Sequence, residues 1–297
     1  MSLLTPIIAI FNAALQPVAP FTWFNISIST LDVAAAFRLC LILRQLKESL
    51  HKDHISKHGL KSIESRSFAR DVSTTLTVVY GGEVMTAPFL GVPPSFMISG
   101  VVPVFYTVVQ AIVEMLPSVP PMTIHTELPL AVLDGFTRAF LLCNLIPPPV
   151  TANSSPLLAS SPWTLLVTSL VAANGGFFLT NLFSFLNPTP LALQTPPELQ
   201  AYGWTTTDLW CAPLITGIYA LLTHAQPFWV DVHTVLSSML GGSVAVSEKG
   251  GSFVEPVDPD TARAACAAIL ATFFVVRSVK NFAPQLWQKK AEKLKTQ

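Results

Sequence analysis

Positive charge is almost missing from the middle of this sequence: between Arg70 and Lys249, Arg138 is the only basic residue. Soluble globular domains carry roughly 25% charged residues, whereas this chain carries 11% and is 51% hydrophobic. Each Lys or Arg at the middle of a bilayer costs about 2.5–3.5 kcal/mol on insertion scales, so membrane helices avoid them. The sequence therefore predicts an all-α membrane protein.

The overall charge and the missing motifs exclude several classes of protein. Lys and Arg total 17 and Asp and Glu total 17, so no basic surplus exists to hold the phosphates of a nucleic acid. High hydrophobicity is the opposite of the composition of disordered chains. The sequence contains no G-x-S-x-G, H-E-x-x-H, Walker or dinucleotide-binding motif. We therefore expect neither an enzyme nor a bound cofactor.

Two residue types that often mark special sites have simpler explanations here. The cysteines all lie in apolar stretches, which indicates unpaired core thiols: Cys40, Cys143, Cys211 and Cys266. The spacing of His51, His54 and His58 lacks the Cys or carboxylate partners of a closed metal site, which favours a solvated helix face. We expect no metal site.

Seven segments come close to the roughly 20 mainly apolar residues that a membrane span needs. They are residues 23–44, 68–90, 96–117, 127–148, 161–186, 208–225 and 263–284. Residues 1–22 are also apolar, but no Lys or Arg precedes them, so they lack the charged region of a signal peptide. We interpret them as a lead-in segment at the membrane interface rather than a true span. The spans together define one membrane domain, residues 23–284.

The basic residues outside the spans predict the orientation. A polar loop at 44–66 and a basic tail at 285–297 hold most of the Lys and Arg residues, and the positive-inside rule places both in the cytosol. Two segments on the same side of a membrane must be separated by an even number of crossings. Six predicted crossings separate the loop from the tail, which satisfies this condition. The same topology places the N-terminus and the acidic segment 226–262 on the far, lumenal side.

A faint internal repeat divides the first six spans into two units, 23–117 and 122–225, with the span 263–284 as a seventh helix. The second span carries Gly81-Gly82 and the fifth carries Gly175-Gly176, each followed by a proline-bearing loop. Because each unit has three crossings, the second unit must be inverted relative to the first. Inverted repeats with glycine-interrupted helices at matching positions indicate a transport pathway.

The glycine pairs allow two interpretations. They could be helix kinks that expose backbone carbonyls to a water-filled path, because a helix opened in lipid must find new hydrogen-bond partners. They could also be small residues that let helices pack closely, as is common in membranes. Their occurrence twice at equivalent positions favours the kinks.

Polar residues inside the spans are the candidate pore and gate residues. Arg138 is an intramembrane cation, and Asp134, one turn earlier on the same helix face, is its expected partner. The pair could line or gate a pore, or it could be a static brace. Glu83 beside the first glycine pair, and Asn174 and Asn181 on one face of the fifth span, could favour a passing cation or simply bond to neighbouring helices.

Two stretches resemble the trimeric intracellular cation channels. Residues 66–94, with Tyr80-Gly81-Gly82 and Leu90-Gly91-Val92-Pro93-Pro94, are similar to the second helix of that family, and residues 171–181 are similar to its fifth. The resemblance covers about residues 20–285. It implies seven helices, a homotrimer with a pore in each subunit, and passage of potassium across an endoplasmic-reticulum membrane during calcium release.

The resemblance departs in the fourth helix. Animal members carry Lys-Glu-Val followed by an Arg, a motif that binds a phosphoinositide, whereas residues 133–138 read Leu-Asp-Gly-Phe-Thr-Arg. The acid is kept as Asp134 and the Lys is absent, so Arg138 is the candidate to bind an anionic lipid.

These observations together predict a passive monovalent cation channel. In this hypothesis the glycine kinks open a path, the carboxylates and the two Asn residues favour cations, and Arg138 is the gate. Two alternatives remain: a secondary transporter, which also uses inverted repeats with broken helices, and a non-conducting membrane scaffold.

Overall fold

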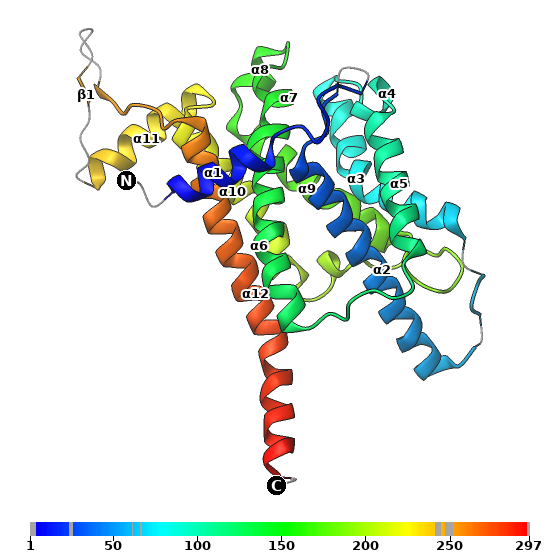
Figure 1. Ribbon diagram of the computed structural model, residues 1–297. Helices are drawn as coiled ribbons and strands as arrows, with labels where there is room; N and C mark the ends of the chain where they lie inside the picture. The colour runs from blue at the N-terminus through cyan, green and yellow to red at the C-terminus, as the bar shows by residue number, and fades with distance from the viewer. Residues whose placement is uncertain are drawn as a thin grey trace.

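The computed structural model describes residues 4–23, 26–60, 62–65, 67–240, 245–246 and 252–295. These residues are mostly helical (Figure 1), as the sequence predicts for an all-α protein. Three helical stretches are long and apolar enough to cross a membrane: Ile124–Thr151, Pro162–Leu182 and Pro259–Phe282. Three shorter helices, Thr5–Ala14, Val101–Met115 and Thr207–Thr223, are also apolar.

Helices make up most of the elements along the chain. The helices are α1 (Thr5–Ala14), α2 (Thr30–His58), α3 (Phe68–Leu90), α4 (Ser95–Ile98), α5 (Val101–Met115), α6 (Ile124–Phe140), the π-helix η1 (Leu141–Leu145), α7 (Pro147–Thr151), α8 (Pro156–Ser160), α9 (Pro162–Leu182), the 3-10 turns η2 (Pro197–Leu199) and η3 (Gly203–Thr205), α10 (Thr207–Thr223), α11 (Pro227–Met239) and α12 (Pro259–Lys295). The strands β1 (Ala245–Val246) and β2 (Ser252–Phe253) form a small antiparallel pair.

The long helices run between two ends of the molecule in alternating directions (Figure 1). α2, α5, α9 and α12 run towards the end where the C-terminus lies, and α3, α6 and α10 run the other way. α12 packs along α6, and α3 packs against α9. The predicted lead-in segment contains α1, which lies across the bundle and buries Phe11 in the core against Phe136 of α6.

The predicted polar loop at 44–66 is wrong over most of its length, because α2 continues to His58. Residues 44–58 contain no Gly or Pro, and eight of these fifteen residues are Leu, Lys, Arg, Gln or Glu, which favour helix. The helix ends at Gly59, whose φ of 66° favours a residue without a side chain. At the other end of the chain, α12 extends through the predicted tail to Lys295. Residues 296–297 of that tail lie outside the described residues.

Helix starts recur at a fixed separation. Ser29 at the start of α2 and Thr123 at the start of α6 each form a capping box, and they are 94 positions apart. Ser67 before α3 and Ser161 before α9 are also 94 positions apart. A capping box satisfies two backbone donors at a helix start, so the same local chemistry fixes where α2 and α6 begin.

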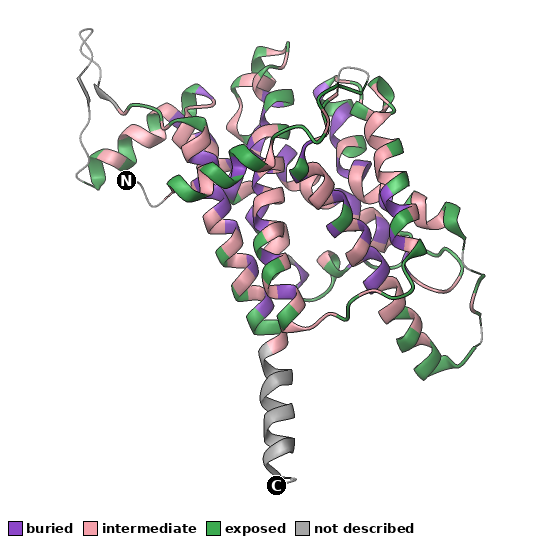
Figure 2. Cartoon of the chain, viewed as in Figure 1, coloured by how far each residue is buried: buried purple, intermediate pink, exposed green. Residues whose placement is uncertain are grey.

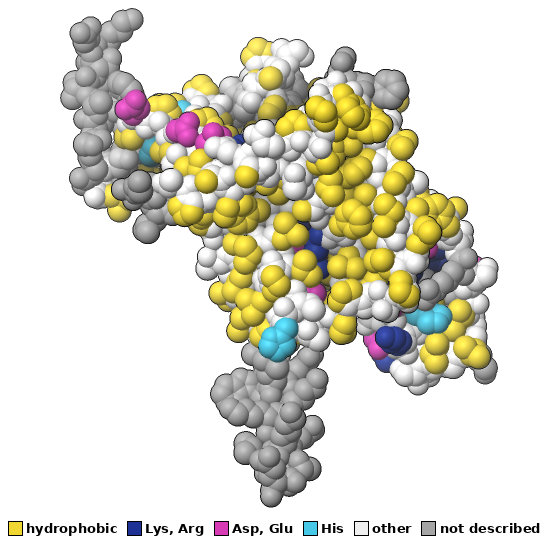
Figure 3. Space-filling model, viewed as in Figure 1, with side chains coloured by type: hydrophobic (Ala, Val, Ile, Leu, Met, Phe, Trp, Pro, Cys, Tyr) yellow, Lys and Arg dark blue, Asp and Glu magenta, His cyan; other side chains and the backbone are white. Residues whose placement is uncertain are grey.

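The outer surface of the bundle is apolar. α5 exposes Val104, Val108 and Ile112, which are four residues apart and therefore lie on one side of the helix. Figure 2 shows the buried residues along the inner faces of the helices, and Figure 3 shows hydrophobic side chains over much of the face formed by α2 and α5. This distribution is the one expected of helices that face lipid. The four cysteines are buried and unpaired, which confirms their interpretation as core thiols.

Candidate functional site: a polar stripe on α6

One face of α6 carries three ionisable side chains, which we call the α6 stripe: Glu127, Asp134 and Arg138. Separations of seven and eleven residues bring side chains back to nearly the same side of an α-helix, and eleven residues rise about 16 Å. The helical stretch that contains them, Ile124–Thr151, is long enough to cross a membrane. The stripe therefore covers about half of the roughly 30 Å hydrocarbon thickness of a bilayer.

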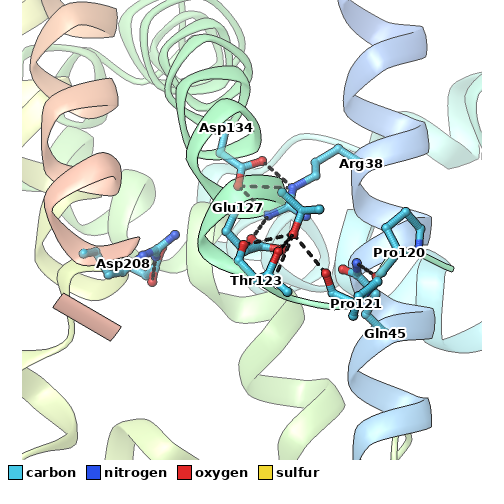
Figure 4. Close-up of polar contacts among 10 residues, drawn as sticks. Arg38, Gln45, Pro120, Pro121, Thr123, Glu127, Asp134 and Asp208 are labelled. Carbon is cyan, nitrogen blue, oxygen red and sulfur yellow. Dashed lines mark hydrogen bonds and ion pairs between the residues drawn. The ribbon is translucent and has the colours of Figure 1, made fainter. Parts of the chain in front are cut away.

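The first two members of the stripe bind Arg38 of α2, and these three residues are called here the acidic cluster. Arg38 Nε donates to both carboxylate oxygens of Asp134, at 3.1 and 3.3 Å. Arg38 Nη2 donates to Asp134 Oδ2 at 3.1 Å and to Glu127 Oε2 at 3.0 Å. The Arg38 side chain is only 8% exposed. Figure 4 shows it reaching from α2 between the two carboxylates of α6.

The last member of the stripe belongs to a second group, the basic cluster, formed by Arg138, Asn174, Asp208 and Arg277. Arg138 Nη2 lies 3.4 Å from Asn174 Oδ1 on α9 and 4.0 Å from Asp208 Oδ1 on α10. Arg277 of α12 pairs with the other oxygen of Asp208. In Figure 4, Asp208 lies on the side of α6 away from Arg38.

The two clusters have opposite formal charges. The acidic cluster contains one arginine and two carboxylates, so its formal charge is negative. The basic cluster contains two arginines and one carboxylate, so its formal charge is positive. The six ionisable groups are together neutral, which lowers the cost of placing them among apolar helices. In Figure 3 a few charged side chains show in the seam between α6 and α2.

Three buried polar atoms of the stripe and its neighbours have no partner among the described residues. They are Arg38 Nη1, Glu127 Oε1 and Arg138 Nε. Buried polar atoms are nearly always hydrogen-bonded, and those without a protein partner are commonly satisfied by water. The stripe and its neighbours therefore hold unused hydrogen-bonding capacity inside the bundle.

The predicted pair of Asp134 with Arg138 is not formed. Asp134 accepts three hydrogen bonds from Arg38 instead, a charge-assisted arrangement that is stronger than one contact along a helix. Arg138 turns to α9 and α10, and its side chain is 20% exposed. A lipid headgroup would have to enter the bundle to reach it.

The other predicted polar residues divide between the site and the rest of the molecule. Asn174 belongs to the basic cluster, where its Oδ1 lies 3.4 Å from Arg138 Nη2. Asn181 is seven residues further along α9, about 10 Å away from Asn174 along the axis. Glu83 accepts hydrogen bonds from the backbone N and Oγ of Ser95, at 2.7 and 2.8 Å, so it caps α4 and does not contact the stripe.

The predicted kinks at the glycine pairs are not found. α3 and α9 are continuous α-helices through Gly81-Gly82 and Gly175-Gly176. The pairs pack against each other: a Cβ on Gly81 would lie 2.9 Å from the Cα of Gly176, and one on Gly175 would lie 2.8 Å from the Cα of Gly82. The packing alternative therefore describes these glycines, because only residues without side chains allow the two helices to approach so closely.

The sequence analysis missed four residues of the site. Arg38 and Arg277 lie inside predicted spans, and Glu127 and Asp208 lie within the first turn of predicted spans. Each is an ionisable group in an apolar segment, so the criterion that identified Arg138 applies to all of them. The scarcity of cations between Arg70 and Lys249 points to Arg138 alone: both additional arginines lie outside that region, and a scarcity of cations does not single out carboxylates.

The geometry of the α6 stripe is the basis for assigning a function. No family model, no curated protein and no solved structure matches this chain.

Proposed function

We propose that this protein is a passive channel for monovalent cations, chiefly potassium, and that ions move along the α6 stripe within each protomer. The observation that carries the proposal is the row of three ionisable side chains on one face of a helix long enough to cross a membrane. Burying such groups in lipid is expensive, and intramembrane charges usually belong to ion pathways. The path is thus placed along α6 rather than at the glycine pairs.

The acidic cluster supplies the preference for cations. Its two carboxylates outnumber its arginine, and Glu127 Oε1 is a buried acceptor without a partner among the described residues. An oxygen atom of this kind replaces part of the hydration shell of a cation. A cation that enters at the end of the stripe where Glu127 lies therefore meets a favourable potential before it reaches Arg138.

Arg138 is the proposed gate and Arg38 is a fixed support. The contacts of Arg138 are long, 3.4 Å to Asn174 and 4.0 Å to Asp208. Arg38 makes four hydrogen bonds of 3.0–3.3 Å and is almost fully buried. Hydrogen bonds weaken steeply with length and poor alignment, so Arg138 is the easier of the two to displace.

We further propose the seven-crossing arrangement of two inverted three-helix units. The contacts at the α3–α9 crossing support it, because they are reciprocal. A Cβ on Gly82 would strike the backbone of Ala172, and a Cβ on Gly176 would strike the backbone of Val78. Adding 94 to Val78 and Gly82 gives Ala172 and Gly176, the same separation that relates the helix starts. Such exchange symmetry is expected of two related units facing each other.

The remaining parts of the proposal follow the resemblance to trimeric intracellular cation channels. They are a homotrimer, an endoplasmic-reticulum membrane, a lumenal N-terminus, a cytosolic C-terminus and counter-ion flow during calcium release. The alternating helix directions and the opposite ends reached by α1 and α12 support the opposite placement of the termini (Figure 1).

Single-channel recording of the purified protein in planar bilayers tests the proposal. We expect discrete current steps with a reversal potential set by potassium, and we expect Arg138→Ala to raise open probability or conductance because it removes the barrier. Lys57→Ala, at the exposed end of α2, is the matched control and should leave currents unchanged. Currents that are the same in Arg138→Ala and the wild type would overturn the gate assignment.

A non-conducting scaffold is the second candidate, and the close packing of the glycine pairs favours it. In that case the α6 stripe only fixes how the helices pack. The absence of any potassium flux in the same reconstitution would support the scaffold. Slow flux without current steps would instead support a transporter.

A further inference from the structure

α11 is an exposed helix whose surroundings differ from those of the bundle. Three residues separate it from the end of α10, and it projects sideways from that end of the molecule (Figure 1). Its 13 residues are about 20 Å long, too short to cross the roughly 30 Å hydrocarbon core. Its position therefore needs an explanation other than membrane spanning.

One side of α11 is fixed to the bundle by specific contacts. Trp229 is buried, and its Nε1 donates to Gln226 Oε1 at 3.0 Å. Gln226 Nε2 in turn donates to the carbonyl oxygens of Ala159 and Ser161, at 2.7 and 3.1 Å. His233 Nδ1 lies 2.8 Å from Nε2 of His224, the residue that ends α10. These contacts set the rotation of α11 about its axis.

A second side of α11 is apolar and exposed. Phe228, Val235 and Met239 are 46%, 50% and 76% exposed. Their separations of seven and eleven residues place them in one row, which we call the α11 stripe. The exposed polar residues Asp231 and Ser238 lie along one edge of that row. α11 thus has a side that contacts protein, an apolar side and a polar edge.

We propose that the α11 stripe inserts into the boundary between headgroups and acyl chains of the same bilayer that the neighbouring helices cross. A helix with protein on one side and an exposed apolar row beside a polar edge is suited to lie in the plane of a membrane surface. The proposed partner is lipid because the preceding helix, α10, is one of the apolar helices of the bundle, and only three residues separate it from α11. This inference needs the membrane location of the bundle and does not need conduction.

Nitroxide accessibility in lipid nanodiscs tests the inference with the full chain. Val235→Cys places a spin label in the α11 stripe, and Ser238→Cys places one at the polar edge of the same helix. The native cysteines are at most 2% exposed, so unmodified protein controls for background labelling. We expect the label at 235 to collide severalfold more with oxygen than with a water-soluble nickel complex. The label at 238 should show the reverse.

Two other outcomes would overturn the inference. Equal access of the nickel complex to both labels would mean that the stripe faces water. A label at 235 that is immobile and protected from both reagents would mean that protein, such as a second copy of the chain, covers the stripe. Loss of potassium currents with lipid contact intact would count against the channel proposal and leave this one standing.

Discussion

Arg38 and Arg138 are the same type of residue on facing helices, yet the bundle holds them very differently. Arg38 satisfies two carboxylates in a buried setting, and Arg138 makes two long contacts. A buried ion pair adds little net stability, but removing one partner leaves the other charges buried without compensation. The two arginines should therefore respond differently to mutation.

Replacing Arg38 by Met should destabilise the protein by about 3–5 kcal/mol, because Glu127 and Asp134 are left without their cation. Denaturant titration in detergent micelles, followed by tryptophan fluorescence, measures the change. Lys57→Met, on the exposed end of the same helix, should change stability by less than about 0.5 kcal/mol.

A second variant separates charge from packing. Arg38→Met combined with Glu127→Leu and Asp134→Leu replaces the whole acidic cluster by apolar residues and should recover most of the lost stability. If the single and triple variants were equally unstable, packing rather than charge would hold α2 against α6.

At the level of elements, the crossing of α3 and α9 sets the shape of the bundle. Gly82→Ala or Gly176→Ala should destabilise the protein by about 1–3 kcal/mol, because the new Cβ would strike the backbone of the facing helix. Gly100→Ala is the matched control, since a Cβ there meets nothing within 4 Å. The same denaturant titration distinguishes them. Wild-type stability in both variants would favour a loose, hydrated crossing.

The sequence predicts the elements better than it predicts the contacts between them. Lipid demands long apolar stretches, so the helices α3, α9 and α10 lie within a few residues of the predicted spans. The prediction of kinks at the glycine pairs was wrong. A glycine within a helical segment looks the same in the sequence whether it kinks the helix or allows another helix to pack closely against it. The two cases differ in whether another helix packs against the glycines. That helix starts 94 positions away in the sequence, so only the folded structure shows the contact.

The same limit applies to the site. Spacing along α6 correctly places Asp134 and Arg138 on one side of the helix, but the actual partner of Asp134 is 96 positions earlier in the chain. The spacing of residues along α6 cannot show whether Asp134 binds Arg138 on the same helix or Arg38 on α2. Four further arginines and carboxylates of the site follow the same rule as Arg138, and applying it to every span would have found them.

At the level of the whole molecule, the ends of the bundle should face opposite sides of the membrane. The C-terminal end of α2 and the connection between α7 and α8 lie at opposite ends of the bundle (Figure 1). Lys57 in the first and Ser154 in the second are exposed. In sealed vesicles a membrane-impermeant maleimide should react with only one of Lys57→Cys and Ser154→Cys until the vesicles are permeabilised. Equal reaction of both from outside would contradict the odd number of crossings between them.

The loosely held guanidinium of Arg138 has a consequence for the response to voltage. It is the one charge that we expect to move, so a protomer transfers at most a single elementary charge through the transmembrane field. That transfer amounts to about 2.3 kcal/mol per 100 mV at most. Specialised voltage sensors move three or four such charges in each of four subunits. A channel of this design would therefore respond to membrane potential gradually, and its currents would rise over a broad range of voltages.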